Sequence, residues 1–407
     1  MSEWKKVKLG DICIIGDGAH ASLKRQKEGI LYITAKNLSE NGLVLSNADY
    51  ISHETYNQYF KDNSKALTKP RKNDILYSII GSIGGCYLIK DEVLGVSSSV
   101  AIFRCKDAIN PMYLFYYLKS DEFKNEIDAI KGGVAQGFMS LSKIGSVAVT
   151  LPPLSTQHRI ATILSRYDSL IENHQKQIKL LEEAAQRLYK EWFIDLHFPG
   201  HENTNIVDGV PVGWEKKKIS DVCTMIGAGS TPSRRNNAYW DDGNIRWVKT
   251  KELLDNWIFD TEEYITEEGL NNSSTKMFPV NTILMAIYAS PTLGRLGILA
   301  QECCCNQAAL GLVANEKLIS WVWLYLKLFE LRDEFNAVAR GAGQQNISGV
   351  VVKNWEITVP NKKTIEDFAK MAKPYFENAK SLQSQLRLLT EARDRLLPKL
   401  MSGEITI

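Results

Sequence analysis

A chain of 407 residues is longer than one ordinary domain, so it can bury more than one hydrophobic core. Its 44% hydrophobic and 24% charged residues are typical of a soluble globular protein, and no run reaches the roughly 18 apolar residues that a membrane span needs. The 49 basic and 47 acidic residues leave a net charge of +2, so any basic surface for nucleic acid has to be local.

Seven cysteines are scattered along the chain, except for the run Cys303, Cys304 and Cys305. None has the paired spacing of a zinc site, and three adjacent thiols cannot easily bind one ion, so we expect this run to pack within a strand. The first ten residues are polar and basic without the apolar core of a secretory signal. The sequence therefore predicts a protein of the reducing cytoplasm with no metal site and no membrane segment.

Residues 1–152 predict a globular domain of mixed type. Short β-like runs at 30–34, 74–80 and 99–103 are separated by glycine-rich turns, and Asn110-Pro111 opens a helix that should reach about residue 130. Strands combined with only one or two helices favour an α+β fold over an alternating parallel sheet.

Residues 153–200 change to the apolar period of a long helix. The d positions of five heptads hold Ile160, Tyr167, His174, Leu181 and Leu188, and the a positions hold Leu164, Ile171, Ile178, Ala185 and Trp192. His174 is a polar interruption of this stripe. From Ser155 to Phe193 the helix would be roughly 58 Å long at ~1.5 Å per residue.

The second half of the chain repeats the first. The segment 4–13 returns at 214–223 with an offset of 210, and from Tyr117 and Tyr325 onward an offset of 208 holds without a gap through the helices. The repeat predicts a second globular domain at 201–360 and a second helical region at 361–407. Pro374 lies near the start of that helix, where it should kink or delay the helix.

An apolar stripe of this length has to be covered. Each helix could lie on its own globule, or the two helices could pair with each other. Because both helices join their globules in the same way, antiparallel pairing would relate the globules by a pseudo-twofold axis. We therefore predict an α+β protein with two tandem α/β domains, each followed by a long helix, and with the two helices paired as an antiparallel coiled coil.

The sequence contains little that could catalyse a reaction. It has no phosphate-binding loop, no metalloprotease motif and no nucleophile elbow, and its six histidines form no ligand-like cluster. Asn110-Pro-Met-Tyr113 resembles the Asn-Pro-Pro-Tyr motif of adenine-N6 methyltransferases. An Asn cap followed by a proline at a helix start explains the same residues, and no glycine-rich cofactor loop precedes them. We expect no active site in this chain.

Several polar residues fit contact with DNA better than catalysis. Lys36-Asn37 and Lys249-Thr250-Lys251 follow strand-like runs in matching places of the two halves, and Thr34 ends the first of these runs. Two glycine-bearing loops carry amides that could bond to adenine, namely Gln136 in the first half, and Gln344 and Asn346 in the second. Turn chemistry alone explains such loops about as often. Weaker candidates are Ser78, Ser82 and Ser290, which lie by further glycine-bearing turns.

Three segments together resemble one known family. Leu151-Pro-Pro-Leu-Ser-Thr-Gln157-His-Arg-Ile160-Ala161 is similar to the segment that opens the conserved helix of Type I restriction-modification specificity subunits, the HsdS family. The Trp-x-x-x-x-Leu/Ile-x-Asp start of each half and Leu397-Pro-Lys-Leu-Met-Ser-Gly-Glu-Ile405 are also typical of it. The second copy departs from the pattern, since Pro360-Asn-Lys-Lys-Thr-Ile-Glu-Asp replaces the first segment.

The resemblance implies a recognition subunit without catalytic activity of its own. Each target-recognition domain would read one half of a split, asymmetric DNA sequence, and the paired helices would set the unread spacer. The helices would also hold two modification (methyltransferase) subunits through residues such as Gln157, Ile160, Ile171 and Leu181. S-adenosylmethionine would bind to those subunits, and ATP and Mg²⁺ to the restriction (motor-nuclease) subunits. Two other hypotheses stay open here, an assembly adaptor that does not touch DNA and a self-contained methyltransferase.

Overall fold

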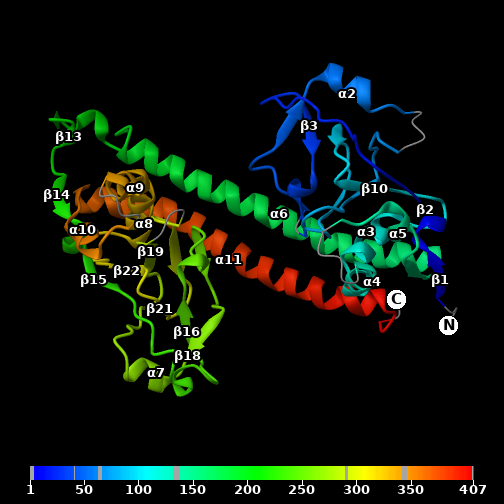
Figure 1. The fold of residues 1–407 in the computed structure, drawn as a ribbon. Coiled ribbons are helices and arrows are strands. Elements are labelled where there is room, and N and C mark those ends of the chain that lie inside the picture. Colours follow the sequence, from blue (N-terminus) through cyan, green and yellow to red (C-terminus); the bar gives the residue numbers. More distant parts are fainter. Residues whose placement is uncertain are drawn as a thin grey trace. The chain divides into compact units, whose positions relative to one another are not determined.

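The structure is a computed structural model that describes residues 4–40, 42–62, 67–131, 138–288, 292–341, 346–405 and 407. It divides into two compact units. Unit 1 comprises residues 1–171 and 388–407, and unit 2 comprises residues 172–387. Two long helices, α6 (Leu154–Phe193) and α11 (Lys362–Met401), each contribute to both units (Figure 1).

Among the described residues, the globular part of unit 1 contains four sheets. A four-stranded sheet has the order β2-β10-β7-β8, a three-stranded sheet has the order β6-β3-β9, and β1 pairs with β11 and β4 with β5. The strands are β1 (Lys5–Lys8), β2 (Cys13–Asp17), β3 (Ile30–Ile33), β4 (Leu38–Ser39), β5 (Gly42–Leu43), β6 (Asp49–Ile51), β7 (Ile75–Ser78), β8 (Cys86–Leu88), β9 (Leu94–Val96), β10 (Val100–Cys105) and β11 (Ala148–Leu151).

Unit 2 repeats the large sheet, the small sheet and the paired end strands, and its large sheet has one additional strand. The orders are β15-β22-β19-β20-β17 and β18-β16-β21, and β14 pairs with β23 and β12 with β13. The strands are β12 (Ile206–Val207), β13 (Val210–Pro211), β14 (Glu215–Lys218), β15 (Cys223–Ala228), β16 (Ile245–Val248), β17 (Asn256–Ile258), β18 (Glu263–Ile265), β19 (Ile283–Ala286), β20 (Leu296–Leu299), β21 (Cys304–Cys305), β22 (Ala309–Ala314) and β23 (Glu356–Val359). The Cys303 to Cys305 run is buried, as expected of residues that pack in and beside a strand.

The helices that cover the sheets also correspond between the units. Asn110 accepts a hydrogen bond from the Tyr113 amide (3.0 Å) and so caps the predicted helix, which is divided at Ser120 into two helices. Ser320 caps the equivalent helix of unit 2. The helices are α1 (Leu9–Ile12), α2 (His53–Tyr59), α3 (Pro111–Lys119), α4 (Asp121–Lys131) and α5 (Leu141–Gly145) in unit 1, and α7 (Glu267–Asn271), α8 (Trp321–Glu330), α9 (Arg332–Gly341) and α10 (Gly349–Asn354) in unit 2.

A glycine occupies the same place in both units where the chain leaves the large sheet. A Cβ on Gly18 would lie 1.9 Å from the carbonyl oxygen of Val96, and a Cβ on Gly229 would lie 1.9 Å from that of Cys305. The residue after each glycine, Ala19 or Ser230, donates its amide hydrogen to that same carbonyl (2.7 and 3.0 Å). Only glycine allows the two backbones to approach this closely.

Each unit buries the end of one long helix together with the start of the other. In unit 1, Leu400 and Met401 of α11 share a hydrophobic core with Ile160 and Leu164 of α6. In unit 2, Phe368, Ala372 and Phe376 of α11 share a core with Tyr189 and Trp192 of α6. Both long helices are therefore stabilised by tertiary packing at each end, rather than by helix propensity alone.

Of the two effects expected of Pro374, a kink or a delayed start of the second helix, the delayed start is wrong. The helix α11 begins at Lys362, twelve residues before Pro374, and continues through it to Met401. Proline lacks the amide hydrogen of one helical bond, which costs about 3 kcal/mol in a helix interior. The fully buried neighbours Phe368 and Ala372 anchor the helix before the proline, and Phe376 anchors it after the proline. Their burial offsets the local cost.

Candidate nucleic-acid interface

The residues around Lys36 form a short turn at the end of the central strand of the small sheet in unit 1. After β3, Thr34 caps the 3₁₀ turn η1 (Ala35–Asn37). Asn37 closes this turn, because its Oδ1 accepts hydrogen bonds from the backbone amide (3.0 Å) and the hydroxyl (2.9 Å) of Thr34. Asn37 is only 2% exposed, whereas the side chain of Lys36 is 57% exposed. Of these predicted residues, Lys36 is the one presented to solvent.

Unit 2 has the same turn at the same place. After β16, Lys249 precedes the 3₁₀ turn η5 (Thr250–Glu252), and Glu252 closes it by accepting the Lys249 amide at 2.7 Å. Lys251 occupies the position of Lys36, the middle of the turn, and its side chain is 59% exposed. The sequence-based expectation that these basic residues follow equivalent strands is therefore confirmed in its geometry.

An arginine that the sequence reasoning missed completes this region in unit 1. Arg25 Nη1 lies 2.6 Å from Asp49 Oδ2, and the guanidinium carbon lies 4.4 Å from the centre of the Tyr32 ring. Lys36 Nζ contacts the same carboxylate oxygen at 3.1 Å. The hydrogen bond from Lys36, together with the positive charges of Lys36 and Arg25, lowers the pKa of Asp49. Two cations thus share one anion beside an aromatic ring.

Unit 2 contains the same combination of side chains. Arg234 pairs with Glu263, and Lys249 Nζ lies 2.6 Å from Glu263 Oε1. The Arg234 guanidinium carbon lies 3.5 Å from the centre of the Trp240 ring and 5.1 Å from that of Trp247. The hydrogen bond with Glu263 raises the pKa of Lys249. We call each of these groups an arginine corner, namely Arg25, Tyr32, Lys36 and Asp49 in unit 1, and Arg234, Trp247, Lys249 and Glu263 in unit 2.

The strand register shows that the acid and the aromatic of the two corners are equivalent, whereas Lys36 lies within its 3₁₀ turn and Lys249 precedes its own. Tyr32 of β3 lies opposite Asp49 of β6, and Trp247 of β16 lies opposite Glu263 of β18. A comparison of the two halves aligned on their central strands reveals the shared acid and aromatic. The arginine is harder to find, because Arg25 precedes Tyr32 by 7 residues and Arg234 precedes Trp247 by 13. One fixed offset cannot align both arginines, so the sequence alone does not show that Arg25 and Arg234 correspond.

The structure gives several other predicted DNA contacts different places. Ser78 is fully buried, and its hydroxyl donates to the Ser82 carbonyl (2.6 Å) and accepts the Gly85 amide (2.8 Å), so it closes a turn and presents nothing to a ligand. Ser82 and Asn346 are exposed. Gln136, Ser290 and Gln344 lie outside the described residues.

The predicted partner-binding residues lie mostly inside the chain itself. The Gln157 amide is buried, donates to the carbonyls of Ala108 (3.3 Å) and Pro152 (2.9 Å), and accepts the Asn110 amide (2.9 Å). Ile160 and Ile171 are buried as well, and Leu181 is partly exposed. Gln157 and Ile160 are therefore not exposed for direct contact with another subunit. They attach the start of α6 to the globule of unit 1.

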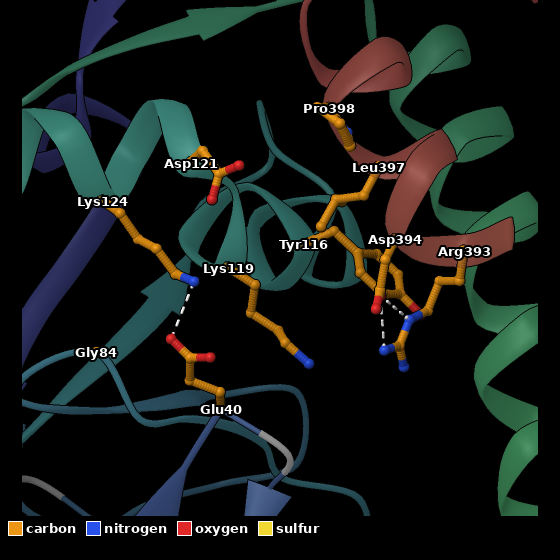
Figure 2. Close-up of a pocket in the computed structure, with 10 residues that line it drawn as sticks. All are labelled: Glu40, Gly84, Tyr116, Lys119, Asp121, Lys124, Arg393, Asp394, Leu397 and Pro398. Atoms are coloured by element: carbon orange, nitrogen blue, oxygen red, sulfur yellow. Dashed lines mark hydrogen bonds and ion pairs between the residues drawn. The ribbon is translucent and has the colours of Figure 1, made fainter. Parts of the chain in front are cut away.

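One cavity of unit 1 has the charge pattern of a solvated surface rather than of an active site. It encloses about 230 Å³ where the end of α11 meets α3 and α4, and Figure 2 shows its lining residues. Lys124 pairs with Glu40 at 2.9 Å, and Arg393 pairs with Asp394 at 2.8 Å, so opposite charges neutralise one another within the cavity (Figure 2). Such a lining does not single out an activated nucleophile or a general base.

In the part of the chain that the structure describes, no group of three His, Cys, Asp or Glu side chains is arranged to hold a metal ion, and no helix is long and apolar enough to cross a membrane. The motif at Asn110 acts structurally, since its side chain caps α3 and its Nδ2 lies 3.0 Å from His158 Nδ1.

Comparison with known proteins decides the family. The model of the Type I restriction modification DNA specificity domain matches residues 1–183 and 211–387, once in each half of the chain. The chain belongs to this family. Both the resemblance seen in the sequence and the prediction of a non-catalytic specificity subunit are thereby confirmed.

Relatives of this specificity subunit match along its whole length. The Type I restriction enzyme MjaIX specificity subunit of Methanocaldococcus jannaschii is 27% identical, with 100% of this chain and 94% of the relative covered. The HindI specificity subunit of Haemophilus influenzae is 25% identical, with 100% of both chains covered. The crystal structure of a Type I restriction-modification S subunit from M. genitalium has a TM-score of 0.64 at 16% identity, over 98% of this chain and 96% of that one. The mixed α+β fold is that of an S subunit.

Proposed function

We propose that this specificity subunit reads a bipartite, asymmetric DNA site, with one half contacted by each unit. The observation that carries the proposal is the duplicated globule. Both copies have the same small sheet, the same paired end strands and the same arginine corner, while the connecting segments differ in length and sequence. A common frame with different loops is what recognition of two different half-sites requires.

The helices α6 and α11 serve, in this proposal, as an antiparallel coiled coil that sets the distance between the half-sites. Support comes from each unit taken alone. In unit 1 the end of α11 packs against the start of α6, and in unit 2 the start of α11 packs against the end of α6. Both sets of contacts need helices that run in opposite directions. The same pattern would relate the two units by a pseudo-twofold axis.

The chemistry would reside on partner subunits. The relatives are named as specificity subunits of Type I restriction enzymes. We therefore propose that two modification subunits, which bind S-adenosylmethionine and methylate adenine, dock on the helical regions, and that motor-nuclease subunits with ATP and Mg²⁺ complete the complex. The chain itself would need no cofactor, and action on host DNA would place it in the cytoplasm.

The test is sequence-selective binding by the complex of this chain with its modification subunit. Gel-shift selection from random-sequence DNA should enrich two short defined segments separated by an undefined spacer of fixed length. Sequencing of methylated adenines in the host genome should return the same two segments. Absence of selective binding would favour an assembly adaptor, and methylation by the isolated chain with bound S-adenosylmethionine would instead show a self-contained methyltransferase.

A further inference from the structure

We infer that the two arginine corners are phosphate anchors, which hold each unit on the DNA backbone without reading the base sequence. The inference rests on the proposed function and adds to it a division of labour between shared and divergent parts of the surface. Arg25 and Arg234 were not among the residues expected to contact DNA, and their role follows from the geometry of the two units.

The corners are equivalent in structure although their sequences differ. Each has a central strand that pairs with one antiparallel and one parallel neighbour, β6 and β9 in unit 1 and β18 and β21 in unit 2. An acid on the antiparallel neighbour faces an aromatic on the central strand, and an arginine both pairs with the acid and lies over an aromatic ring. Tyr has changed to Trp and Asp to Glu between the copies. The chemistry has been kept through these changes.

A feature common to both units should bind something common to both half-sites. The half-sites of an asymmetric target differ in base sequence, but both have the same sugar-phosphate backbone. Contacts that identify bases must therefore differ between the units, whereas backbone contacts can be identical. The corners are part of the common frame, which assigns them to phosphate.

The side chains suit this role. Stacking on an aromatic ring and a bond to one carboxylate hold the guanidinium in place, so less side-chain entropy is lost when an oxyanion binds. Even so, the Arg25 side chain is 40% exposed and that of Arg234 is 50% exposed, so N–H donors remain accessible to a ligand. In unit 1, Arg25 and Lys36 share Asp49, which leaves one net positive charge. In unit 2, Lys249 lies 2.6 Å from Glu263 and 3.2 Å from Glu262, so the cations Arg234, Lys249 and Lys251 face two glutamates, again with one net positive charge among these groups.

Each corner has a lysine in the middle of its 3₁₀ turn, Lys36 within the corner of unit 1 and Lys251 beside the corner of unit 2. Lys36 and Lys251 occupy the same position of their 3₁₀ turns and are both exposed. Lys251 Nζ contacts Glu262 at 2.5 Å, which, with Lys249, lowers the pKa of that glutamate. A phosphate arriving here would exchange one of these surface ion pairs, each worth little in water, for a charge-assisted bond to DNA.

The experiment uses the complex of the full chain with its modification subunit. Arg25→Ala, Arg234→Ala and the double variant are compared with the control Lys72→Ala, which removes another exposed cation of unit 1 that pairs with Asp91 at 2.7 Å. Binding to target and to non-target duplexes is measured by fluorescence anisotropy between low and physiological salt. Methylated sites are sequenced for each complex.

Each single arginine variant should weaken binding on the order of tenfold at physiological salt, equally for target and non-target DNA. The slope of log K against log salt should become shallower by about 0.9 per arginine removed. The methylated sequence should stay that of the parent, and Lys72→Ala should behave as the parent. Arg25→Lys and Arg234→Lys keep the charge and should restore most of the slope.

Three outcomes would overturn the inference. A relaxed base preference confined to one half-site would make the arginine a base reader. Unchanged binding and salt slope together with a lower unfolding midpoint would make the corner a purely structural ion pair. A changed slope for Lys72→Ala equal to that of the arginine variants would mean that general charge alone is responsible. If the parent complex shows no sequence selectivity, the proposed function fails. Binding to non-target DNA still tests the phosphate anchors in that case.

Discussion

Arg393 Nη1 of α11 lies 2.8 Å from Asp168 Oδ1 of α6, and this ion pair joins the two long helices within unit 1. The other carboxylate oxygen of Asp168 accepts the Tyr116 hydroxyl at 2.6 Å, so α3 is tied to the same acid. In the sequence of α11, Arg393 stands at a heptad position whose other members are apolar, namely Ala372, Ala379, Leu386 and Leu400. The interruption has a physical reason, since a partly buried arginine here has an acid on α6 as its partner.

Removal of Asp168 should destabilise unit 1. Asp168→Ala leaves the Arg393 guanidinium and the Tyr116 hydroxyl without this partner, and the loss of such charged hydrogen bonds costs about 1–3 kcal/mol. Urea unfolding should show a lower midpoint for the transition of unit 1. Arg395→Ala, which breaks only an exposed i,i+4 pair with Glu391, is the control and should change the midpoint little. If both variants lower the midpoint equally, the contacts of Asp168 with Arg393 and Tyr116 are not a special source of stability in unit 1.

Gly18 and Gly229, the glycines at which the chain leaves the large sheet of each unit, should not tolerate a side chain. Gly18→Ala places a Cβ 1.9 Å from the Val96 carbonyl oxygen, and Gly229→Ala creates the same clash with Cys305. We expect each to lower stability by about 2–4 kcal/mol, because backbone has to move on both sides of the contact. Thermal unfolding of the purified chain measures this effect. Gly145→Ala places a Cβ 3.6 Å from Ile15 Cδ1 and 3.9 Å from Gly10 Cα, which are ordinary contacts, and should be neutral. Normal stability of Gly18→Ala would show that the backbones of Gly18 and Val96 are not packed closely enough to exclude a Cβ atom.

Stability of unit 2 should fall as pH rises toward 7. Glu182 lines a cavity of about 200 Å³ with Tyr325 and Phe376, and burial, reinforced by the charge of Asp255, raises its pKa from 4.5 to about 7. The folded state therefore holds a proton more tightly than the unfolded state, and the stability it gains is lost between pH 4.5 and about 7.

Glu182→Gln should remove this pH dependence and raise the melting temperature at pH 8 more than at pH 5. Differential scanning calorimetry at both pH values gives the comparison. The control is Glu183→Gln, since Glu183 is the neighbouring acid and lies 3.8 Å from Lys179. If Glu182→Gln and Glu183→Gln change the pH profile alike, burial of Glu182 is not its cause.

The helices should act as a ruler. One heptad inserted into α6 after Ile171 and one into α11 after Arg387 lengthen both helices where the units divide, while the apolar stripe stays in phase. Seven residues add about 10.5 Å at ~1.5 Å each, which is about three base pairs at ~3.4 Å. The spacer of the methylated sequence should grow by that number. An unchanged spacer would refute the ruler, and insertion into α6 alone should abolish methylation by misaligning the stripes.

The sequence by itself determined the duplication, the two long helices and the family. These features are local or periodic, so they survive in the order of residues: the offset of 208 joins Tyr117 to Tyr325, heptads mark α6 and α11, and Asn110 marks a helix start by its cap chemistry. The 3₁₀ turns with Lys36 and Lys251 could also be found, because each directly follows its strand.

Only the tertiary structure decided which polar residues face outward and which arginine joins them. Binding sites often use polar side chains such as those of Asn37, Ser78 and Gln157. Here these side chains form hydrogen bonds within turns or at the start of a helix instead. Arg25 reaches Asp49 across 24 residues and Arg234 reaches Glu263 across 29. The loops between each arginine and its acid have different lengths, so no fixed spacing in the sequence records these ion pairs. The strand register alone shows that the acids and aromatics of the two corners correspond.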